Sequence, residues 1–495
     1  MSTRGDSVVG VGDSRLFAGI GARVASSLEE NGTLVIVLSA FAIVTLVQLP
    51  AALVQDGWMA LVSGRFVAHH GLPSHETLTV WAHGRRWTDQ QWLAQLVLYE
   101  LQRLGGIRLV MIVHAALTTA GLAGAAVVAR RLGGSARSAT WTAVPVLFAY
   151  WGEAGVMRTQ SLAYILFVVV LWLLLDDRRR PSARVFAVLP VLVLWANLHG
   201  SVIVGAALVS GYGLVELAAM RRSLRRDRAV RFAALLTAPW LCVLASPYAT
   251  SLPAYYEKVL VSSGFGSYVT EWAPTTLSLH NFAVFVLALG GLWLIGRAGG
   301  AVSTFEKLAF VGLTLLAFDA VRNGPWIALI SLVVLPRLLD SLRRPAFEPR
   351  RANRLLAVAA LASLVAATVA VAAKPSSWFT TGYPDAAAGA AAKAAGTTGR
   401  IFADERFSDW LLWKEPQLAG RVAFDTRFEL LKPSELRSVD QVRFRAGDWR
   451  SLLHGYSVLV FEPVQETQPI AALERSKAAH VIESSHGVVV LAHAG

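Results

Sequence analysis

The chain has 495 residues, of which 55% are hydrophobic and only 16% are charged, and its mean hydropathy is +0.50. These values exclude an ordinary soluble protein and predict a polytopic membrane protein. The net charge of +13 is strongly basic, but the cations lie between apolar runs, so membrane topology explains them better than nucleic-acid binding.

The chain begins with a polar stretch, residues 1–31, which we expect to be cytoplasmic and partly disordered. The first apolar run starts near Val35. It is longer than a signal-peptide core and has no clear cleavage site, so it is predicted to be an anchor. Apolar runs recur from here to residue 373 and predict about eleven transmembrane helices, at 32–53, 107–129, 138–150, 159–175, 185–197, 200–219, 232–246, 281–296, 303–318, 325–340 and 355–373.

The fifth and sixth of these spans are separated at residues 197–200. Polar groups at the centre of a bilayer are costly and Gly breaks helices, which favours two spans over one. Most cations then fall in one set of loops, with clusters at 178–184, 221–231 and 343–354. The positive-inside rule places those loops and the N-terminus in the cytoplasm. With eleven spans, the C-terminus lies outside a bacterial inner membrane.

The first outer loop, residues 54–106, is too long for a simple connection. Trp58, Leu61 and Phe66 recur at helical spacing, as do Trp92 and Tyr99, which predicts two amphipathic helices in the membrane interface with aromatic rings at headgroup depth. Between them, residues 78–87 alternate like a hairpin around His83-Gly84.

The tail, residues 374–495, predicts a small extracytoplasmic α/β domain. It opens with an Ala-rich helix at 385–395. Strand-like runs follow at 400–403, 422–424, 458–461 and 488–492, with helical segments at 409–413, 434–444 and 449–453. The single cysteine, Cys242, lies in an apolar run and excludes a disulfide framework within the chain.

The outward loops collect acidic, basic and amide side chains, whereas the inward loops hold little but Arg. This asymmetry predicts an outer site, whose candidate residues are Asp56, Glu153, Arg158, Asn197, His199, Tyr248, Glu271, Arg322 and Asn323. Transfer of a sugar from a lipid phosphate needs a carboxylate base, for which Asp56 is the candidate, and cations that hold the leaving phosphate, for which Arg158 and Arg322 are the candidates. Asn197 and His199 would bind donor phosphate or sugar hydroxyls.

Structural explanations compete with these roles. Arg158 pairing with Glu153, Arg322 pairing with Asp319, and an internal Asp425–Arg427 ion pair would each account for the same residues. Asp56 would then be a solvated carboxylate at a helix end, where a charge costs little.

Scattered motifs resemble the GT-C superfamily of membrane glycosyltransferases, and more closely a bacterial group of membrane proteins with that outline. The matching residues are Asp56-Gly57-Trp58, Gly64, His70-Gly71-Leu72-Pro73, Gly84-Arg85-Arg86-Trp87, Trp92-Leu93, Arg158-Thr159-Gln160, Trp195 to Ser201, Ser246-Pro247-Tyr248, Glu271-Trp272, Arg322-Asn323 and Asp425-Thr426-Arg427. The chain departs from that group at Val54, Ala60, Gln90 and Ser246, where the group often carries an acid, two His and an Asn. Asp56 therefore acts alone, or with Glu76 or Asp89.

The resemblance implies hexosyl or pentosyl transfer, with inversion, from a polyprenyl-phosphate-linked donor to an extracytoplasmic glycan, lipid or protein, in biosynthesis of a cell-envelope polysaccharide. Membrane lipids are further expected partners, and Arg427 is a further candidate for acceptor binding or support. No cofactor is predicted; a divalent cation stays open but has no support in the sequence. The alternatives are a transporter or flippase for a lipid-linked or polar solute, and a non-catalytic GT-C-like scaffold. A transporter would be expected to show repeated halves and broken spans at the midplane, and the chain shows neither.

Overall fold

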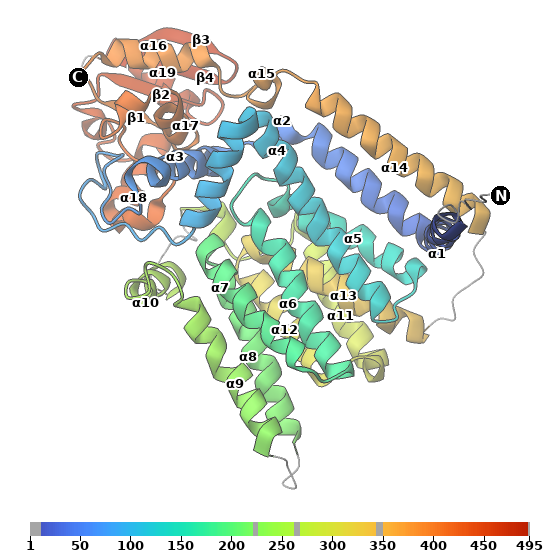
Figure 1. The fold of residues 1–495 in the computed structure, drawn as a ribbon. Coiled ribbons are helices and arrows are strands. Elements are labelled where there is room, and N and C mark those ends of the chain that lie inside the picture. Colours follow the sequence, from blue (N-terminus) through green and yellow to red (C-terminus); the bar gives the residue numbers. More distant parts are fainter. Residues whose placement is uncertain (1–10, 221–225, 262–267, 343–349, 494–495) are drawn as a thin grey trace, which may run out of the picture.

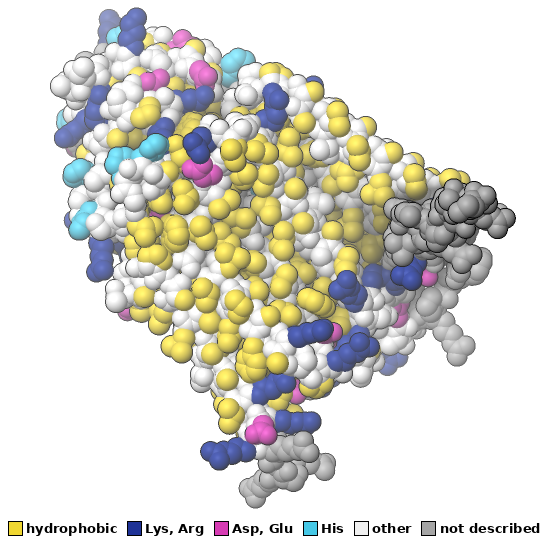
Figure 2. Space-filling model, in the orientation of Figure 1, with side chains coloured by type: hydrophobic (Ala, Val, Ile, Leu, Met, Phe, Trp, Pro, Cys, Tyr) yellow, Lys and Arg dark blue, Asp and Glu magenta, His cyan; other side chains and the backbone are white. Residues whose placement is uncertain are grey.

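The computed structural model describes residues 11–220, 226–261, 268–342 and 350–493. A large helical part carries a small α/β domain at one end (Figure 1). On the face that Figure 2 shows, a broad apolar band lies between the charged ends. That band matches the lipid-facing surface expected of a membrane protein.

A helix covers each of the eleven predicted spans. The helices of this part are α1 (Val11–Val47), α2 (Leu49–Ala52), α3 (Gln55–His70), α4 (Trp92–Arg131), α5 (Ala136–Ala154), α6 (Ser161–Arg179), α7 (Val188–Leu198), α8 (Val202–Ala219), α9 (Arg226–Val243), α10 (Leu252–Tyr256), α11 (Phe282–Ala298), α12 (Thr304–Asp319), α13 (Gly324–Leu342) and α14 (Arg350–Ala372). Among the described residues, six helical segments are long and apolar enough to cross a membrane, within α1, α4, α8, α11, α13 and α14. Of the basic clusters, residues 221–225 and 343–349 lie outside the described residues.

Helix α13 is the centre of this part. Its residues from Gly324 to Pro336 are buried on every side, as expected for a helix that is apolar all round. It packs against α4, α5, α11 and α12. Helix α14 runs beside α1 at the periphery (Figure 1) and leaves most of its apolar surface outside the protein, where lipid would cover it.

A break in the helix is confirmed at the predicted division between the fifth and sixth spans. Helix α7 ends at Leu198 and α8 begins at Val202. His199 between them has an extended backbone, which places its side chain in a turn rather than on a helix inside the bilayer.

The stretch predicted as a polar, partly disordered lead is helical from Val11 onward. Helix α1 already begins at Val11 and continues without a break into the apolar run. Residues 1–10 lie outside the described residues.

The two predicted helices of the first outer loop are present. Helix α3 packs against α4 and against α17 of the C-terminal domain, so the ring of Trp58 is almost fully buried rather than exposed to lipid headgroups as predicted. The second helix is the first half of α4, which continues through a kink into the predicted span. The kink lies at Gly105 and Gly106, and Gly106 has a φ of 67°, a left-handed conformation that suits glycine.

The C-terminal domain has helices α15 (Ser376–Phe379), α16 (Asp385–Ala395), α17 (Glu405–Lys414), α18 (Pro433–Phe444) and α19 (Thr467–Arg475), and strands β1 (Ile401–Ala403), β2 (Val458–Phe461), β3 (Ala479–Ser485) and β4 (Val488–His493). The strand order is β1-β2-β4-β3. Strands β1 and β2 are parallel, with Ile401 opposite Val458, and the other pairs are antiparallel. The predicted helix at 385–395 is confirmed. The prediction missed β3 and α19, and residues 449–453 form only a short 3-10 turn.

The first outer loop is joined to this domain by backbone pairing. Val80 N donates to Val422 O at 2.8 Å and Trp81 N donates to Ala423 O at 2.9 Å. The predicted strand at 422–424 is therefore a set of isolated bridges, to Thr79 on one side and Ile401 on the other. The predicted hairpin is present around a bridge between His75 and Arg86. The loop and the domain share one hydrophobic core, which fixes the domain over the ends of the membrane helices.

Candidate functional site

A cavity of about 1090 Å³ lies between the ends of the membrane helices and the C-terminal domain. Its lining comes from α3, the loop before α4, the turns α5–α6, α7–α8 and α12–α13, the loop before α11, and the C-terminal domain. The candidate residues in the lining are Asp56, Glu153, Arg158, His199, Glu271, Arg322, Asn323 and Arg427. Residues distant in sequence thus meet in one space of the size that small-molecule sites occupy.

Arg158 forms ion pairs with three acidic residues of the cavity. Its Nε donates to Asp56 Oδ2 at 2.6 Å, and its Nη1 donates to Glu153 Oε2 at 2.7 Å. Its Nη2 forms an ion pair with Glu271. One guanidinium therefore orients three carboxylates, and the predicted pairing of Arg158 with Glu153 is only part of its network.

Side chains of α4 and α6 hold the turn that carries Arg158. Ser161 Oγ donates to the carbonyl of Arg158 at 2.5 Å, and His114 Nδ1 lies 3.0 Å from the same hydroxyl. Thr118 Oγ1 donates to the carbonyl of Ala154 at 3.2 Å. These contacts fix the backbone on both sides of Arg158.

Arg322 is bound more loosely than Arg158. Its Nη1 donates to Glu271 Oε1 at 3.4 Å, and its guanidinium lies over the ring of Trp272, 4.2 Å from the centroid. The predicted partner, Asp319, is not the residue that pairs with it. Because a stacked guanidinium keeps donors free at its edge, Arg322 is better able than Arg158 to receive an anion.

Two of the three carboxylates that pair with Arg158, Asp56 and Glu271, have pKa values shifted in opposite directions. Burial raises the pKa of Asp56 above its ordinary value, and the nearby charge of Glu271 adds to this, although Arg158 works to lower it. Burial also works to raise the pKa of Glu271, but Arg158 and Arg322 outweigh it and hold that pKa below its ordinary value. When the pKa values of two neighbouring acids are moved apart in this way, one acid can exchange a proton while the other stays charged.

His199 is a neutral donor. Burial, aided by the charges of Arg322 and Arg158, lowers its pKa to about 3. Its Nδ1 accepts from the backbone N of Ser201 at 3.1 Å, so the ring proton must be on Nε2. That N–H suits an uncharged or anionic oxygen in the cavity.

Four predicted site residues lie outside the cavity lining. Asn197 donates to the carbonyls of Val193 and Ala245, and Tyr248 donates to the carbonyl of Pro73, so their polar groups hold backbone segments together. Glu76 and Asp89 are buried away from Asp56. Asp56 therefore has Arg158 as its neighbour rather than a second acid of the same loop.

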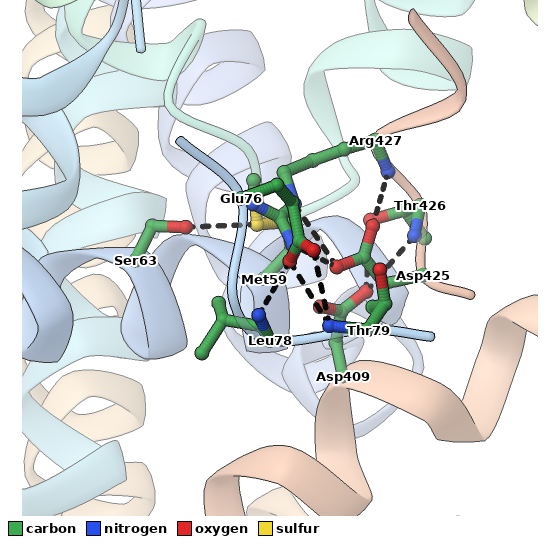
Figure 3. Close-up of polar contacts among 9 residues, drawn as sticks. All are labelled: Met59, Ser63, Glu76, Leu78, Thr79, Asp409, Asp425, Thr426 and Arg427. Atoms are coloured by element: carbon green, nitrogen blue, oxygen red, sulfur yellow. Dashed lines mark hydrogen bonds and ion pairs between the residues drawn. The ribbon is translucent and has the colours of Figure 1, made fainter. Parts of the chain in front are cut away.

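Arg427 lines the cavity, but it also fastens the C-terminal domain to the outer loop. Its Nη2 donates to Glu76 Oε1 at 2.7 Å, its Nε donates to Asp425 Oδ2 at 2.9 Å, and its guanidinium lies 4.2 Å from the ring centroid of Trp87. Figure 3 shows Glu76, Asp425 and Arg427 in one cluster with Met59 of α3 and Asp409 of α17. The internal Asp425–Arg427 pair considered from the sequence is present.

Asn323 lines the cavity through its place in the turn before α13. Its side chain donates to the carbonyl of Leu316 at 3.0 Å and so closes the end of α12. That contact is structural, and it leaves the amide oxygen as the group Asn323 would offer a ligand.

The sequence analysis missed several lining residues, which include Gln90, Gln91, Glu405, Glu429 and Arg443. Those from the C-terminal domain face the cavity only because the domain docks over it, and no local pattern signals that. Within the described ranges, no group of three or more His, Cys, Asp and Glu has a geometry that could hold a metal ion.

No protein-family model and no curated protein sequence matches the chain. Its fold, however, is similar to solved structures. ArnT from Cupriavidus metallidurans bound to undecaprenyl phosphate has a TM-score of 0.55 at 15% identity, over 93% of this chain and 98% of that chain. The same protein in the apo state has a TM-score of 0.53 at 12% identity, over 97% and 98%. The apo oligosaccharyltransferase from Archaeoglobus fulgidus has a TM-score of 0.51 at 11% identity, over 86% and 69%.

These likenesses define the class of fold. The chain is a helical membrane protein with a GT-C-like fold and a small C-terminal α/β domain. The fold that the sequence motifs implied is thereby confirmed.

Proposed function

We propose that this protein is a glycosyltransferase that moves a hexosyl or pentosyl group from a polyprenyl-phosphate-linked donor to an acceptor outside the cytoplasm. The observation that carries the proposal is the pair of groups in one cavity: a carboxylate, Asp56, with a raised pKa, and a cation, Arg322, with free donors. A fold shared with ArnT bound to undecaprenyl phosphate supports a polyprenyl phosphate as ligand.

The reaction is a single displacement with inversion at the sugar carbon. Asp56 takes the proton of an acceptor hydroxyl as its oxygen attacks that carbon. The bond between the sugar carbon and the phosphate oxygen breaks, and the polyprenyl phosphate leaves with one more negative charge. A base whose pKa lies nearer to the working pH than that of a free Asp is more effective, which is the use of the raised pKa.

The remaining cavity residues have supporting roles in this proposal. Arg322 stabilises the charge that develops on the leaving phosphate, and His199 donates through Nε2 to a phosphate or sugar oxygen. Arg158 is saturated by three carboxylates, so we assign it to positioning Asp56 rather than to holding phosphate. Glu271, whose pKa is held below its ordinary value by Arg158 and Arg322, stays ionised beside it.

The cavity would face the outer side of a bacterial inner membrane, where lipid-linked sugars are used without nucleotide donors. The excess of Arg in the loops at the other end of the helices supports this orientation.

The experiment is transfer in proteoliposomes. The full-length protein is reconstituted with radiolabelled polyprenyl-phosphate-linked hexose or pentose and an outer-membrane or cell-wall extract as the source of acceptor. We expect label to move from the lipid to a larger product, and we expect Asp56→Asn to prevent this. Retention of all label on the lipid with the wild-type protein, for every sugar tried, would overturn the proposal.

A further inference from the structure

A second cavity of about 340 Å³ adjoins the first. It lies between the chain segment that leads into α3 and the C-terminal domain. Its walls are Pro50, Ala51, Leu53, Val54, Gln55, Gly382, Tyr383, Asp404, Glu405, Arg406, Arg443, Glu462 and Gln465. Gln55, Glu405, Arg443 and Gln465 line both cavities, so they form a common wall between the side cavity and the cavity that Asp56 lines.

The cations of this side cavity are already paired. Arg443 Nη2 donates to Glu405 Oε1 at 2.6 Å, and Arg443 Nε lies 3.4 Å from Glu466 Oε1. Arg406 pairs with Glu462 and lies over the ring of Tyr383, 5.6 Å from the centroid. Carboxylates thus outnumber guanidiniums here, and a phosphate would meet repulsion rather than a free cation.

Two carboxylates of the side cavity keep part of their surface accessible. The side chain of Glu405 is 22% exposed and that of Glu462 is 13% exposed, and both line the cavity. Ionised carboxylates are hydrogen-bond acceptors only. A group that supplies O–H donors would bond to them.

The remaining walls add apolar surface. Pro50, Ala51 and Val54 line the cavity from the chain segment that leads into α3. An apolar wall beside carboxylate acceptors suits a sugar or polyol, whose C–H faces are apolar and whose hydroxyls are donors. Ala51 and Gln465 are exposed, so the cavity reaches the protein surface.

We propose that the side cavity binds the acceptor as a neutral, hydroxyl-bearing group and delivers one hydroxyl past the Glu405–Arg443 wall to Asp56. The inference rests on the proposed glycosyl transfer and adds the side from which the acceptor enters. The anionic donor is held at Arg322, in the part of the main cavity that the side cavity does not share. The acceptor arrives from the side on which carboxylates outnumber guanidiniums. Each substrate thus meets a charge environment that suits it.

The test uses two amphiphiles with one tail. Octyl glucoside is the neutral hydroxyl-bearing probe and octyl phosphate is the anionic probe, each with a diazirine at the same carbon of its octyl chain. The full-length protein in nanodiscs is photolabelled, and labelled peptides are found by mass spectrometry. We expect octyl glucoside to label the peptides around Ala51 and Tyr383 about tenfold more strongly than octyl phosphate does.

A matched pair of glycine variants tests the location. In Gly382→Leu the new Cβ meets only the end of Arg406 Nη2, at 2.9 Å, so the side chain fills the cavity at little cost to the fold. Gly389→Leu is the control, because a Cβ there meets no atom within 4 Å and the position is outside both cavities. Labelling by octyl glucoside should fall about tenfold in the first variant and stay unchanged in the second. Ala51→Trp is a second way to fill the same space.

Equal labelling by the two probes, or wild-type labelling in both Gly382→Leu and Ala51→Trp, would overturn the inference. Binding of undecaprenyl phosphate is measured on the same samples and should be unaffected by either filling variant. If the wild-type protein does not bind undecaprenyl phosphate, the proposed donor is wrong, whatever the octyl glucoside result. The two proposals therefore fail on different measurements.

Discussion

Arg158 Nε donates to Asp56 Oδ2 at 2.6 Å, and this contact joins the start of α3 to the turn between α5 and α6. It fixes the orientation of the one carboxylate to which we assign proton transfer. Asp56 stays partly exposed, with a third of its side chain accessible, so it is oriented without being closed off from a substrate.

Asp56→Asn should abolish transfer while the protein still inserts and folds. Asn keeps the shape but cannot take a proton, and loss of a general base typically costs about 100- to 10,000-fold in rate. The rate is measured by the proteoliposome assay and the fold by thermal melting in detergent. Asp448→Asn on the exposed surface of the C-terminal domain is the control and should keep its rate. Full activity in Asp56→Asn would show that the base is another residue.

The pH dependence of transfer should carry the signature of Asp56. Its pKa is raised by burial, and only its ionised form accepts a proton. Activity should therefore fall as the pH falls through a value above the ordinary pKa of Asp, rather than at that ordinary value. A rate that stays constant from neutral pH down to the ordinary pKa range of carboxyl groups would contradict this assignment.

Arg322→Ala and Arg158→Ala should have different effects. Removing Arg322 removes a charged donor to phosphate, so binding of undecaprenyl phosphate should weaken by about 10- to 100-fold with little change in melting temperature. Removing Arg158 leaves three carboxylates without their shared cation, so the melting temperature should fall and transfer should stop. Equal binding by Arg322→Ala and wild type would remove Arg322 as the phosphate holder.

Arg427→Leu should loosen the C-terminal domain from the outer loop. The side chain is 2% exposed and pairs with Glu76 and Asp425, which are also buried. Breaking such a pair from one side typically costs about 3–5 kcal/mol. Arg103→Leu breaks an exposed pair with Glu100 and should cost only about 1 kcal/mol or less. The two variants are compared by thermal melting and limited proteolysis, and equal effects would contradict the proposed role of the Arg427 cluster.

The orientation in the membrane has its own test. Alkaline phosphatase, which is active only outside the cytoplasm, should be active when fused after the last residue. A silent fusion at this position, together with active fusions in the loops 130–137 and 178–184, would reverse the proposed orientation.

The sequence was informative about the helices because long apolar runs and Gly breaks are local signals. The division at residues 197–200 and the helix at 385–395 follow from such signals. Strand β3 was missed because its polar residues, His480 and Glu483 among them, hide a weak alternation. The pairing of Val80 and Trp81 with Val422 and Ala423 joins segments more than 300 residues apart, which no periodicity reveals.

The site was predictable only as a set of outward polar residues. Asp56, Arg158, Glu271 and Arg322 do meet in one cavity, as the clustering on the outer loops indicated. Asn197 and Tyr248 belong to the same loops, yet their polar groups bond to backbone carbonyls. Loop position says which side of the membrane a side chain occupies, but its direction depends on packing that a single sequence does not show.

The most direct test of the central proposal is native mass spectrometry of the protein purified with its lipids. We predict a bound polyprenyl phosphate on the wild-type protein that is lost in Arg322→Ala and kept in the surface variant Asp448→Asn. Absence of a polyprenyl phosphate from the wild type after addition of undecaprenyl phosphate, or equal retention in Arg322→Ala, would contradict the account.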